Sequence, residues 1–318
     1  MEDVFQVEEP TANLHEGALY SLGLDVEDRK ARGKRVRPAL CLLIAQALGS
    51  TRHAALPFAA AIEILHNFAL VHDDIEDGDT VRRGRPSTWK QYGLAHGINI
   101  GDYMLAKVFQ VILRDDRNPI EVREQLLILL DKTLEELFAG QAMDISARQT
   151  DHFTLEEYNL LVARKTGSYL AAPMLGGAVI AGARPAVLRS LDQLGHHLGP
   201  LFQVRDDLID LTSGKGRGEI GNDIREGKRS YLVAVAAESC LPSDRARLFE
   251  ILNRSREETS AEDVAWCVEL FRRSGAIARA EARCQELRVA AMGTIESLDE
   301  PLRGLLETTI KVLAERQQ

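Results

Sequence analysis

The feature that most constrains the fold is a series of long segments whose apolar residues recur with helical spacing. Apolar residues at every third or fourth position indicate helices with one buried face. Alternation of apolar and polar residues, which would indicate strands, is nearly absent, and most prolines lie at segment edges, where they punctuate helices. The predicted helices cover residues 36–49, 54–77, 89–113, 121–146, 155–163, 189–211, 230–238 and 261–272, and a last one extends from Ala276 onward.

Several of these segments are rich in Ala and Leu and apolar over much of their circumference, which is typical of helices inside a large bundle. Hydrophobic residues make up 45% of the 318 residues, and no segment has the composition of a linker between domains. The sequence therefore predicts one all-α domain over residues 1–318, a single large helical bundle in which residues 1–12 are flexible.

Net charge, apolar run lengths and cysteine spacing argue against nucleic-acid binding, a membrane span and a cysteine metal site. With 39 basic and 48 acidic residues the net charge is −9, which argues against sequence-independent binding of nucleic acid. No apolar run reaches the roughly 18 residues that a membrane-spanning helix needs, so no membrane span is expected. The four cysteines are scattered without metal-ligand spacing, which predicts free thiols in a cytoplasmic protein.

An acidic motif closes the predicted helix 54–77. Five carboxylates occur between Asp73 and Asp79, and Asp73 and Asp77 share a helix face with His66, seven residues before Asp73. Carboxylates at this spacing repel each other unless a cation lies between them, and their hard oxygens suit Mg²⁺. The alternative is a solvated acidic helix end, although negative charge at a helix C-terminus opposes the macrodipole.

A second motif of the same form, Asp-Asp-x-x-Asp, lies late in the apolar segment 189–211. Asp206 and Asp210 share a helix face, Asp207 follows Asp206 directly, and Gln203 precedes them by about one turn. Acidic side chains within such an apolar helix are rarely buried without a partner. Two helices that face each other with these motifs across a bundle would hold a cluster of metal ions.

Basic side chains gather before the first long helix, after the first acidic motif, and on both sides of the second. Arginine forks and lysine point charges bind polyphosphates, so these clusters predict a site for a metal-bound phosphate. The alternative is that the arginines after the first motif only neutralise its aspartates as surface ion pairs. The residues concerned are Lys34, Arg35, Arg37, Arg82, Arg83, Arg85, Lys165, Lys215, Arg217, Arg225, Lys228 and Arg229.

The motifs resemble those of the trans-isoprenyl diphosphate synthase family, the short-chain polyprenyl synthases that include farnesyl and geranylgeranyl diphosphate synthases. The resemblance runs from about Gly33 to Lys228. Its motifs stand at residues 33–38, 73–77, 82–84, 140–144, 165–167, 202–210, 223 and 227–228. The resemblance implies a Mg²⁺-dependent prenyltransferase, a homodimer, that condenses isopentenyl diphosphate with an allylic diphosphate (dimethylallyl, geranyl or farnesyl).

The resemblance also implies a role for each matching position. The side chains expected to bind the diphosphate of isopentenyl diphosphate are Lys34, Arg37, His66 and Arg83. The expected Mg²⁺ ligands are Asp73, Asp77, Asp206 and Asp210. The side chains expected to contact the allylic diphosphate are Arg82, Lys165, Thr166, Gln203 and Lys228. The expected catalytic set is Asp73, Asp77, Lys165, Asp206 and Asp207.

One position departs from the family pattern. The family usually has a Gly-Lys pair shortly before the aspartate matched by Asp223, and here the lysine position falls on Gly218. Lys215 and Arg217 are the nearby bases that could replace it, and the sequence leaves the choice open.

Product length is implied by the residues before the first acidic motif. In this family the growing chain runs along that helix toward its N-terminal end, past Ala69 and Phe68. Helix periodicity alone points Phe68 well off the face of Asp73. An aromatic residue five positions before a motif without an insertion is, however, similar to archaeal-type geranylgeranyl synthases. A mainly twenty-carbon product is therefore predicted, with fifteen carbons as the alternative.

Two other functions stay open. A class I terpene cyclase shares the bundle, and Asn222-Asp223 begins its Asn-Asp-x-x-Ser-x-x-x-Glu motif, but Glu226 stands at the serine position. The second Asp-Asp-x-x-Asp and the cluster of Lys34 and Arg37 favour two diphosphates, and hence a synthase. A non-catalytic partner subunit of another synthase would tend to lose its aspartate motifs, and this chain keeps both.

Overall fold

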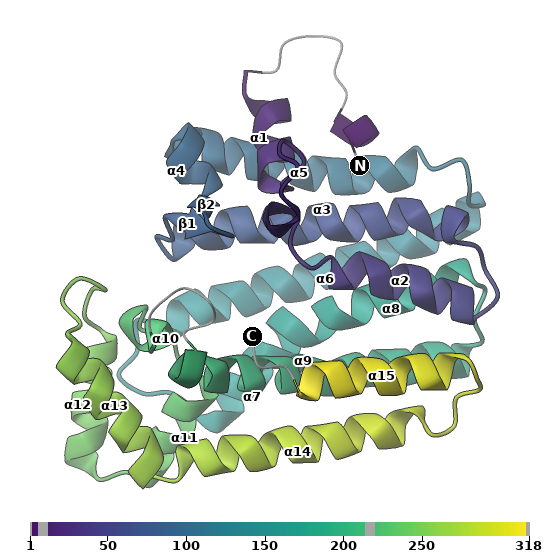
Figure 1. Ribbon diagram of the computed structural model, residues 1–318. Helices are drawn as coiled ribbons and strands as arrows, with labels where there is room; N and C mark the ends of the chain where they lie inside the picture. Colours follow the sequence, from purple (N-terminus) through teal and green to yellow (C-terminus); the bar gives the residue numbers. More distant parts are fainter. Residues whose placement is uncertain (1, 6–11, 214–219, 316–318) are drawn as a thin grey trace. The chain divides into compact units, whose positions relative to one another are not determined.

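The computed structural model describes residues 2–5, 12–213 and 220–315. Over these residues the chain is helical apart from one two-stranded hairpin (Figure 1). The prediction of an all-α fold is confirmed. The bases Lys215 and Arg217, and the departure at Gly218, lie outside the described residues.

Packing divides the chain into two compact units. Unit 1 comprises Met1–Leu130 and Ala172–Leu188, and unit 2 comprises Asp131–Ala171 and Arg189–Gln318. The division falls within three continuous helices, α6, α8 and α9. The expectation of a single domain stays a prediction.

Unit 1 is built around α3, which is 25 residues long and lies alongside α2 and α5 (Figure 1). Phe58, Ile62 and Leu65 of α3 are fully buried, as are Ile100 and Met104 of α5. The elements that contribute to this unit are η1 (Glu2–Phe5), α1 (Leu14–Ser21), η2 (Arg29–Arg32), α2 (Val36–Ala47), α3 (Arg52–Glu76), β1 (Val81–Arg82), β2 (Arg85–Pro86), α4 (Thr88–Tyr92), α5 (Leu94–Leu113), α6 (Ile120–Ala147) and α8 (Ser168–Ile180).

Glycines allow α8 to approach its neighbours in unit 1. A Cβ added at Gly176 would lie 1.9 Å from the ring of Phe58, and one at Gly177 would lie 2.5 Å from the carbonyl oxygen of Cys41. Neither distance is possible for real atoms, so larger residues at these positions would push α8 away from α2 and α3.

Unit 2 contains the second acidic motif and the C-terminal helices. In Figure 1, α14 lies alongside α15, and it also packs against α11 and α13. Two of its helices begin with a capping box, α7 at Thr154 and Glu157 and α13 at Ser260 and Asp263. The elements of this unit are α7 (Leu155–Val162), a π-helical turn (Ala163–Gly167), α9 (Pro185–Ser213), α10 (Asn222–Arg225), α11 (Tyr231–Ser239), α12 (Pro242–Leu252), α13 (Ala261–Arg273), α14 (Ala276–Ile295) and α15 (Leu302–Ala314).

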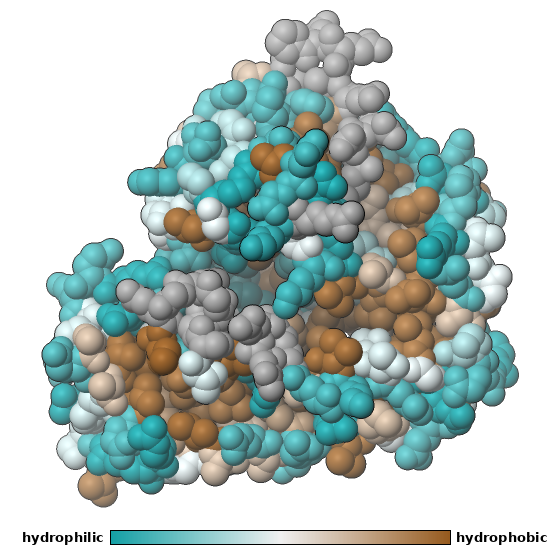
Figure 2. Space-filling model, viewed as in Figure 1, coloured by the Kyte–Doolittle hydropathy of each residue, from teal (hydrophilic) through white to brown (hydrophobic). Residues whose placement is uncertain are grey.

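One helix matches a membrane span by length and composition, which the expectation from apolar run length did not anticipate. The best window of α3 has a mean hydropathy of 1.6, but 67% of that window is buried inside the protein, as in a core helix. The surface in Figure 2 is largely hydrophilic, with separate hydrophobic patches.

Candidate active site

The first acidic motif lies at the C-terminal end of α3. Asp73 and Asp77 are half-buried, and Asp77 follows the last helical residue. Asp74 is 2% exposed, and its carboxylate accepts hydrogen bonds from Nε (2.7 Å) and Nη2 of Arg82. Trp89 Nε1 donates to the carbonyl oxygens of Asp74 and Asp79. Asp74 therefore anchors the end of the helix, while Asp73 and Asp77 lie four residues apart on a different face.

The three arginines after this motif have different partners. Arg82 pairs with Asp74 and also approaches Asp79, with Nη2 3.4 Å from Oδ2. Arg85 forms a two-pronged ion pair with Asp25 (2.9 and 2.5 Å) and lies over the ring of Tyr20. Arg83 donates to two neutral oxygens instead, which are described below. Neutralisation of the motif thus accounts for Arg82, but Arg85 neutralises a different carboxylate, and Arg83 forms no ion pair with any residue that the structure describes.

A tight turn holds Arg83 in place. Strands β1 and β2 pair with Val81 opposite Pro86 and Arg82 opposite Arg85, so Arg83 and Gly84 form the two-residue loop. Both have positive φ, 52° and 76°, as a type I′ turn requires. The conformation is unfavourable for Arg, at a cost on the order of 1–3 kcal/mol, and such outliers cluster at functional sites.

The structure brings His66 and the expected substrate-binding arginines of unit 1 together. Burial lowers the pKa of His66 well below its usual range, and the nearby positive charges of Arg37 and Arg83 lower it further. The imidazole is therefore neutral near pH 7 and can donate one hydrogen bond. Arg37 lies in the first turn of α2, and Lys34 lies exposed in the preceding loop.

The residues expected to set product length lie one turn before Asp73. Phe68 is 3% exposed, and its ring centroid is 4.8 Å from that of His72. Ala69 is half-buried. Their contact with a prenyl chain stays a prediction.

In unit 2, adjacent aspartates of the second motif differ sharply. Asp206 is half-buried, whereas Asp207 is 2% exposed and its carboxylate accepts four hydrogen bonds. The donors are Tyr158 Oη (3.1 Å), Gln203 Nε2 (3.0 Å), Lys228 Nζ (3.4 Å) and the backbone N–H of Tyr231 (2.9 Å). The geometry indicates a structural role for Asp207, whose carboxylate connects four groups of this site. Its assignment to the catalytic set stays a prediction.

Lys165 and Thr166 lie in the π-helical turn, a feature that often occurs at functional sites. Lys165 Nζ donates to Asp144 Oδ2 at 2.7 Å. Burial alone would raise the pKa of Asp144, but the charges of Lys165 and Arg148 outweigh it and lower the pKa. A Cβ at Gly140 would lie 2.5 Å from the backbone nitrogen of Lys165, so glycine lets α6 pack directly against the turn.

Lys228 lies between two carboxylates after α10. Its ammonium donates to Asp223 (3.2 Å) and Asp207 (3.4 Å). Burial alone would lower its pKa, but Asp223, Asp207 and Asp206 raise the pKa well above its usual range. Asp210, 1% exposed, accepts the backbone N–H of Asp223 at 3.1 Å. Unit 2 therefore gathers the expected residues Gln203, Asp206, Asp207, Asp210 and Lys228.

The sequence groups Arg229 with the bases expected at a phosphate site, but the structure gives this side chain protein oxygens as partners. This side chain is fully buried, and burial lowers its pKa to about 10. It donates to oxygens of residues far apart in sequence, namely the carbonyls of Gly227, Leu252, Arg148 and Thr150 and the side chain of Asn253. It thereby ties the loop that carries Lys228 to the end of α6, which no local pattern indicates.

The carboxylates offered by both motifs suit a hard cation. Among the described residues, no three His, Cys, Asp or Glu side chains form a group that could hold a metal ion by themselves. Mg²⁺ commonly takes one or two carboxylates and completes its shell with waters and substrate phosphates. Asp73 with Asp77, and Asp206 with Asp210, therefore fit a Mg²⁺ that arrives with a diphosphate.

Comparisons with known proteins agree with these motifs. Residues 27–271, more than half of the chain, match the family model described as polyprenyl synthetase. The short chain isoprenyl diphosphate synthase of Methanothermobacter thermautotrophicus is 35% identical over 85% of this chain and 82% of its own. The geranylgeranyl diphosphate synthase of Methanosarcina mazei is 36% identical over 73% and 71%.

Solved structures give the same result. The crystal structure of geranylgeranyl pyrophosphate synthetase from Pyrococcus horikoshii superposes with a TM-score of 0.88 at 30% identity, over 99% of this chain and 93% of that one. Two observations therefore agree. Each unit holds an aspartate-rich motif with its own basic cluster, and most of the chain matches proteins of one family. The chain belongs to the polyprenyl synthetase family and is a prenyltransferase.

Proposed function

We propose that the chain condenses isopentenyl diphosphate with an allylic diphosphate and makes mainly geranylgeranyl diphosphate. One observation carries the proposal: unit 1 and unit 2 each hold an Asp-Asp-x-x-Asp motif with its own set of basic side chains. Two such sets suit a reaction that binds two diphosphates. Relatives of this chain include geranylgeranyl, farnesyl and geranylfarnesyl diphosphate synthases, so the product is proposed from Phe68 and Ala69.

The chain's residues bind and orient the two substrates. In unit 1, Lys34, Arg37 and Arg83 neutralise the diphosphate of isopentenyl diphosphate, and neutral His66 donates one hydrogen bond to it. In unit 2, Lys165 and Lys228, with Gln203 and Thr166, contact the allylic diphosphate, and Arg82 of unit 1 is proposed to contact it as well. Preorganised positive charge of this kind lowers the energy of a departing anion.

The reaction itself needs no side-chain nucleophile. Bound Mg²⁺ would supply additional positive charge to the departing diphosphate. The allylic carbon–oxygen bond breaks, and the double bond of isopentenyl diphosphate attacks the allylic cation to form a carbon–carbon bond. A proton is then lost to the released diphosphate, which restores a double bond. Apolar surroundings exclude the water that would otherwise quench the cation.

We further propose that the enzyme is a cytoplasmic homodimer primed by dimethylallyl, geranyl or farnesyl diphosphate. Exposed apolar side chains on α5 and on the part of α6 that belongs to unit 1 support an interface between copies, because burial of apolar surface favours association. These side chains are Leu94, Ile98, Leu113, Ile120 and Ile128.

Product analysis of two variants tests the proposed chain length. Phe68→Ala removes a ring one turn before the metal-binding carboxylates and should lengthen the product by at least one five-carbon unit. Ala69→Phe should shorten it. Products are dephosphorylated and separated by chromatography, and circular dichroism confirms that both variants fold. An unchanged distribution in both variants would show that this turn does not set product length.

The geometry disfavours a terpene cyclase. The position that holds serine in the cyclase motif is Glu226, whose side chain is 7% exposed and lies 3.7 Å from Arg256. An ion-paired carboxylate at this place does not offer the neutral hydroxyl of that motif. A cyclase would release a cyclic hydrocarbon or alcohol from the allylic substrate alone, whereas the proposed activity requires isopentenyl diphosphate.

A further inference from the structure

A buried amide and a buried acid on α3 form a chain of hydrogen bonds that ends at the guanidinium of Arg83. Glu63 and Asn67 are 2% and 1% exposed, and they lie one turn apart on the same face. Asn67 Nδ2 donates to the carbonyl oxygen of Glu63 (2.8 Å) and to its carboxylate Oε1 (3.0 Å). Neither residue belongs to the expected substrate-binding set, although both lie next to it.

The acid dictates which way the amide points. An amide has one donating and one accepting end, and the two are told apart by their partners. Because both contacts with Glu63 require a donor, the Nδ2 end of Asn67 must face Glu63. The accepting end, Oδ1, then faces Arg83, whose Nη1 donates to it at 3.2 Å.

The partners of Arg83 are neutral. Besides Asn67 Oδ1, its Nη1 donates to the carbonyl oxygen of Ala31 at 3.1 Å. Arg82 and Arg85, on either side of the same turn, are instead paired with carboxylates. Arg83 is therefore held in a fixed position by hydrogen bonds to neutral groups. The carboxylate of Glu63 acts on its charge without a direct ion pair, so the guanidinium can still bind an anion.

The backbone at Gly33 packs closely against the guanidinium of Arg83. A Cβ at Gly33 would lie 2.7 Å from Arg83 Cζ, so only glycine leaves room for it there. The positive φ of Arg83 is unfavourable for a residue other than glycine, and the paired strands β1 and β2 together with the side-chain contacts maintain it.

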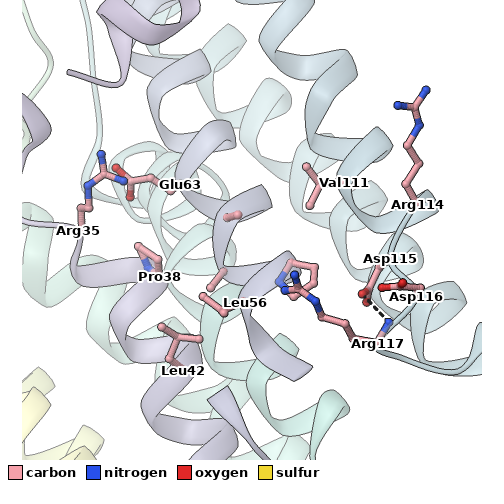
Figure 3. Close-up of a pocket in the computed structure, with 13 residues that line it drawn as sticks. Arg35, Pro38, Leu42, Leu56, Glu63, Val111, Arg114, Asp115, Asp116 and Arg117 are labelled. Carbon is pink, nitrogen blue, oxygen red and sulfur yellow. Dashed lines mark hydrogen bonds between the residues drawn. The ribbon is translucent and has the colours of Figure 1, made fainter. Parts of the chain in front are cut away.

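Glu63 also faces a second arginine. Both Glu63 and Arg35 line a cavity of about 530 Å³ beside α2, α3 and α5, and Figure 3 shows their side chains pointing toward one another. Arg35 Nη2 donates to the carbonyl oxygen of Leu22, and its φ is 48°. The carboxylate of Glu63 thus lies near Arg35 and Arg83, and both arginines have an unfavourable positive φ.

We propose that Asn67, oriented by Glu63, is a positioning residue that fixes the guanidinium of Arg83 for the diphosphate of isopentenyl diphosphate. This inference rests on the proposed function. Neither side chain touches the reacting atoms. Their effect reaches the substrate only through Arg83, and this makes the inference separable from a general effect on folding.

The first test compares Michaelis constants. Asn67→Leu has a similar volume but can neither accept from Arg83 nor donate to Glu63. Because the bond from Ala31 remains, the KM for isopentenyl diphosphate should rise roughly tenfold rather than more. The allylic KM and kcat should be unchanged. If Asn67→Leu does not fold, Asn67→Ala removes the same amide without added bulk and carries the same expectation.

A double-mutant cycle distinguishes positioning from a structural role. In an Arg83→Ala background, addition of Asn67→Leu should change the KM for isopentenyl diphosphate by less than about twofold, because the group it positions is already gone. A further tenfold rise in that background would overturn the proposal, because Asn67 would then act independently of Arg83.

One more variant serves as a control. Asp115→Asn changes another buried carboxylate of unit 1, one that accepts from Arg117 and Asn118 of its own loop, and should leave kinetics unchanged.

The outcomes separate the inference from the function on which it rests. If the wild-type chain does not consume isopentenyl diphosphate, the proposed function is wrong. If the wild type is active and Asn67→Leu keeps the wild-type KM for isopentenyl diphosphate, the function stands and the positioning role of Asn67 is refuted.

Discussion

Asp207 and Asp206 are neighbours in one motif, yet the structure predicts opposite consequences for their substitution. Asp207→Asn keeps the volume but replaces one acceptor oxygen with a donor. The carboxylate now accepts from Tyr158 and Tyr231 on Oδ2 and from Gln203 and Lys228 on Oδ1. Whichever way the new amide turns, it presents a donor to two donors.

The cost follows from these four bonds. The Tyr158 hydroxyl can rotate and accept, but the backbone N–H of Tyr231 cannot. Loss of one hydrogen bond to a charged acceptor costs about 1.5–3 kcal/mol. Breaking a buried ion pair costs roughly 3–5 kcal/mol, but Lys228 keeps Asp223 as a second partner, so only part of that applies. We expect Asp207→Asn to lower the free energy of unfolding by about 3 kcal/mol, a large share of a typical total of 5–15 kcal/mol.

Unfolding experiments on both variants measure this difference. Asp207→Asn should lower the apparent melting temperature by about 4–5 °C, as measured by circular dichroism, and should also lower the urea midpoint. Asp206→Asn should leave it nearly unchanged but reduce Mg²⁺-dependent turnover by on the order of 100-fold or more. Equal stability of the two variants, or loss of turnover without loss of stability in Asp207→Asn, would refute the structural role of Asp207.

Two further predictions follow from the basic clusters. Lys34→Ala and Arg37→Ala should raise the KM for isopentenyl diphosphate more than the KM for the allylic substrate. Lys165→Ala should raise the allylic KM more. Equal effects on both substrates would contradict the assignment of two separate diphosphate sites. The pKa of Asp144 is lowered in the folded state, so its stabilisation is present above its unfolded pKa of about 3.9 and is lost as pH falls through the folded pKa. Urea unfolding from pH 6 down to pH 3 should therefore show a steeper loss of stability in wild type than in Asp144→Asn, and parallel curves would contradict this.

The all-α fold is readable from the sequence because helical periodicity is strong in the amphipathic segments. Helix α2 begins where predicted, and α3 ends within one residue of the prediction. The predicted helix 89–113 is split into α4 and α5 at Gly93, whose φ is 89°, a conformation that helices do not contain. The sequence analysis does not predict helix α8. Its own residues are small or apolar around the whole circumference, so no helical periodicity distinguishes it.

The site was predictable where its chemistry lies within short motifs. Acidic pairs four residues apart and runs of arginine can be found by spacing alone. The support network cannot, because Asn67 and Arg83 are 16 residues apart, Arg85 and Asp25 are 60 apart, and Arg229 reaches residues about 80 apart from it. Which arginine is paired with a carboxylate depends on these tertiary contacts, and three arginines within four residues cannot reveal it.

The most direct test is the mass of the product made by the purified chain alone. The chain is incubated with Mg²⁺, isopentenyl diphosphate and dimethylallyl, geranyl or farnesyl diphosphate in turn, and the dephosphorylated products are analysed by mass spectrometry. The account predicts chain extension that requires isopentenyl diphosphate and ends mainly at the twenty-carbon alcohol. A cyclic hydrocarbon formed without isopentenyl diphosphate, or no extension of any primer, would contradict it.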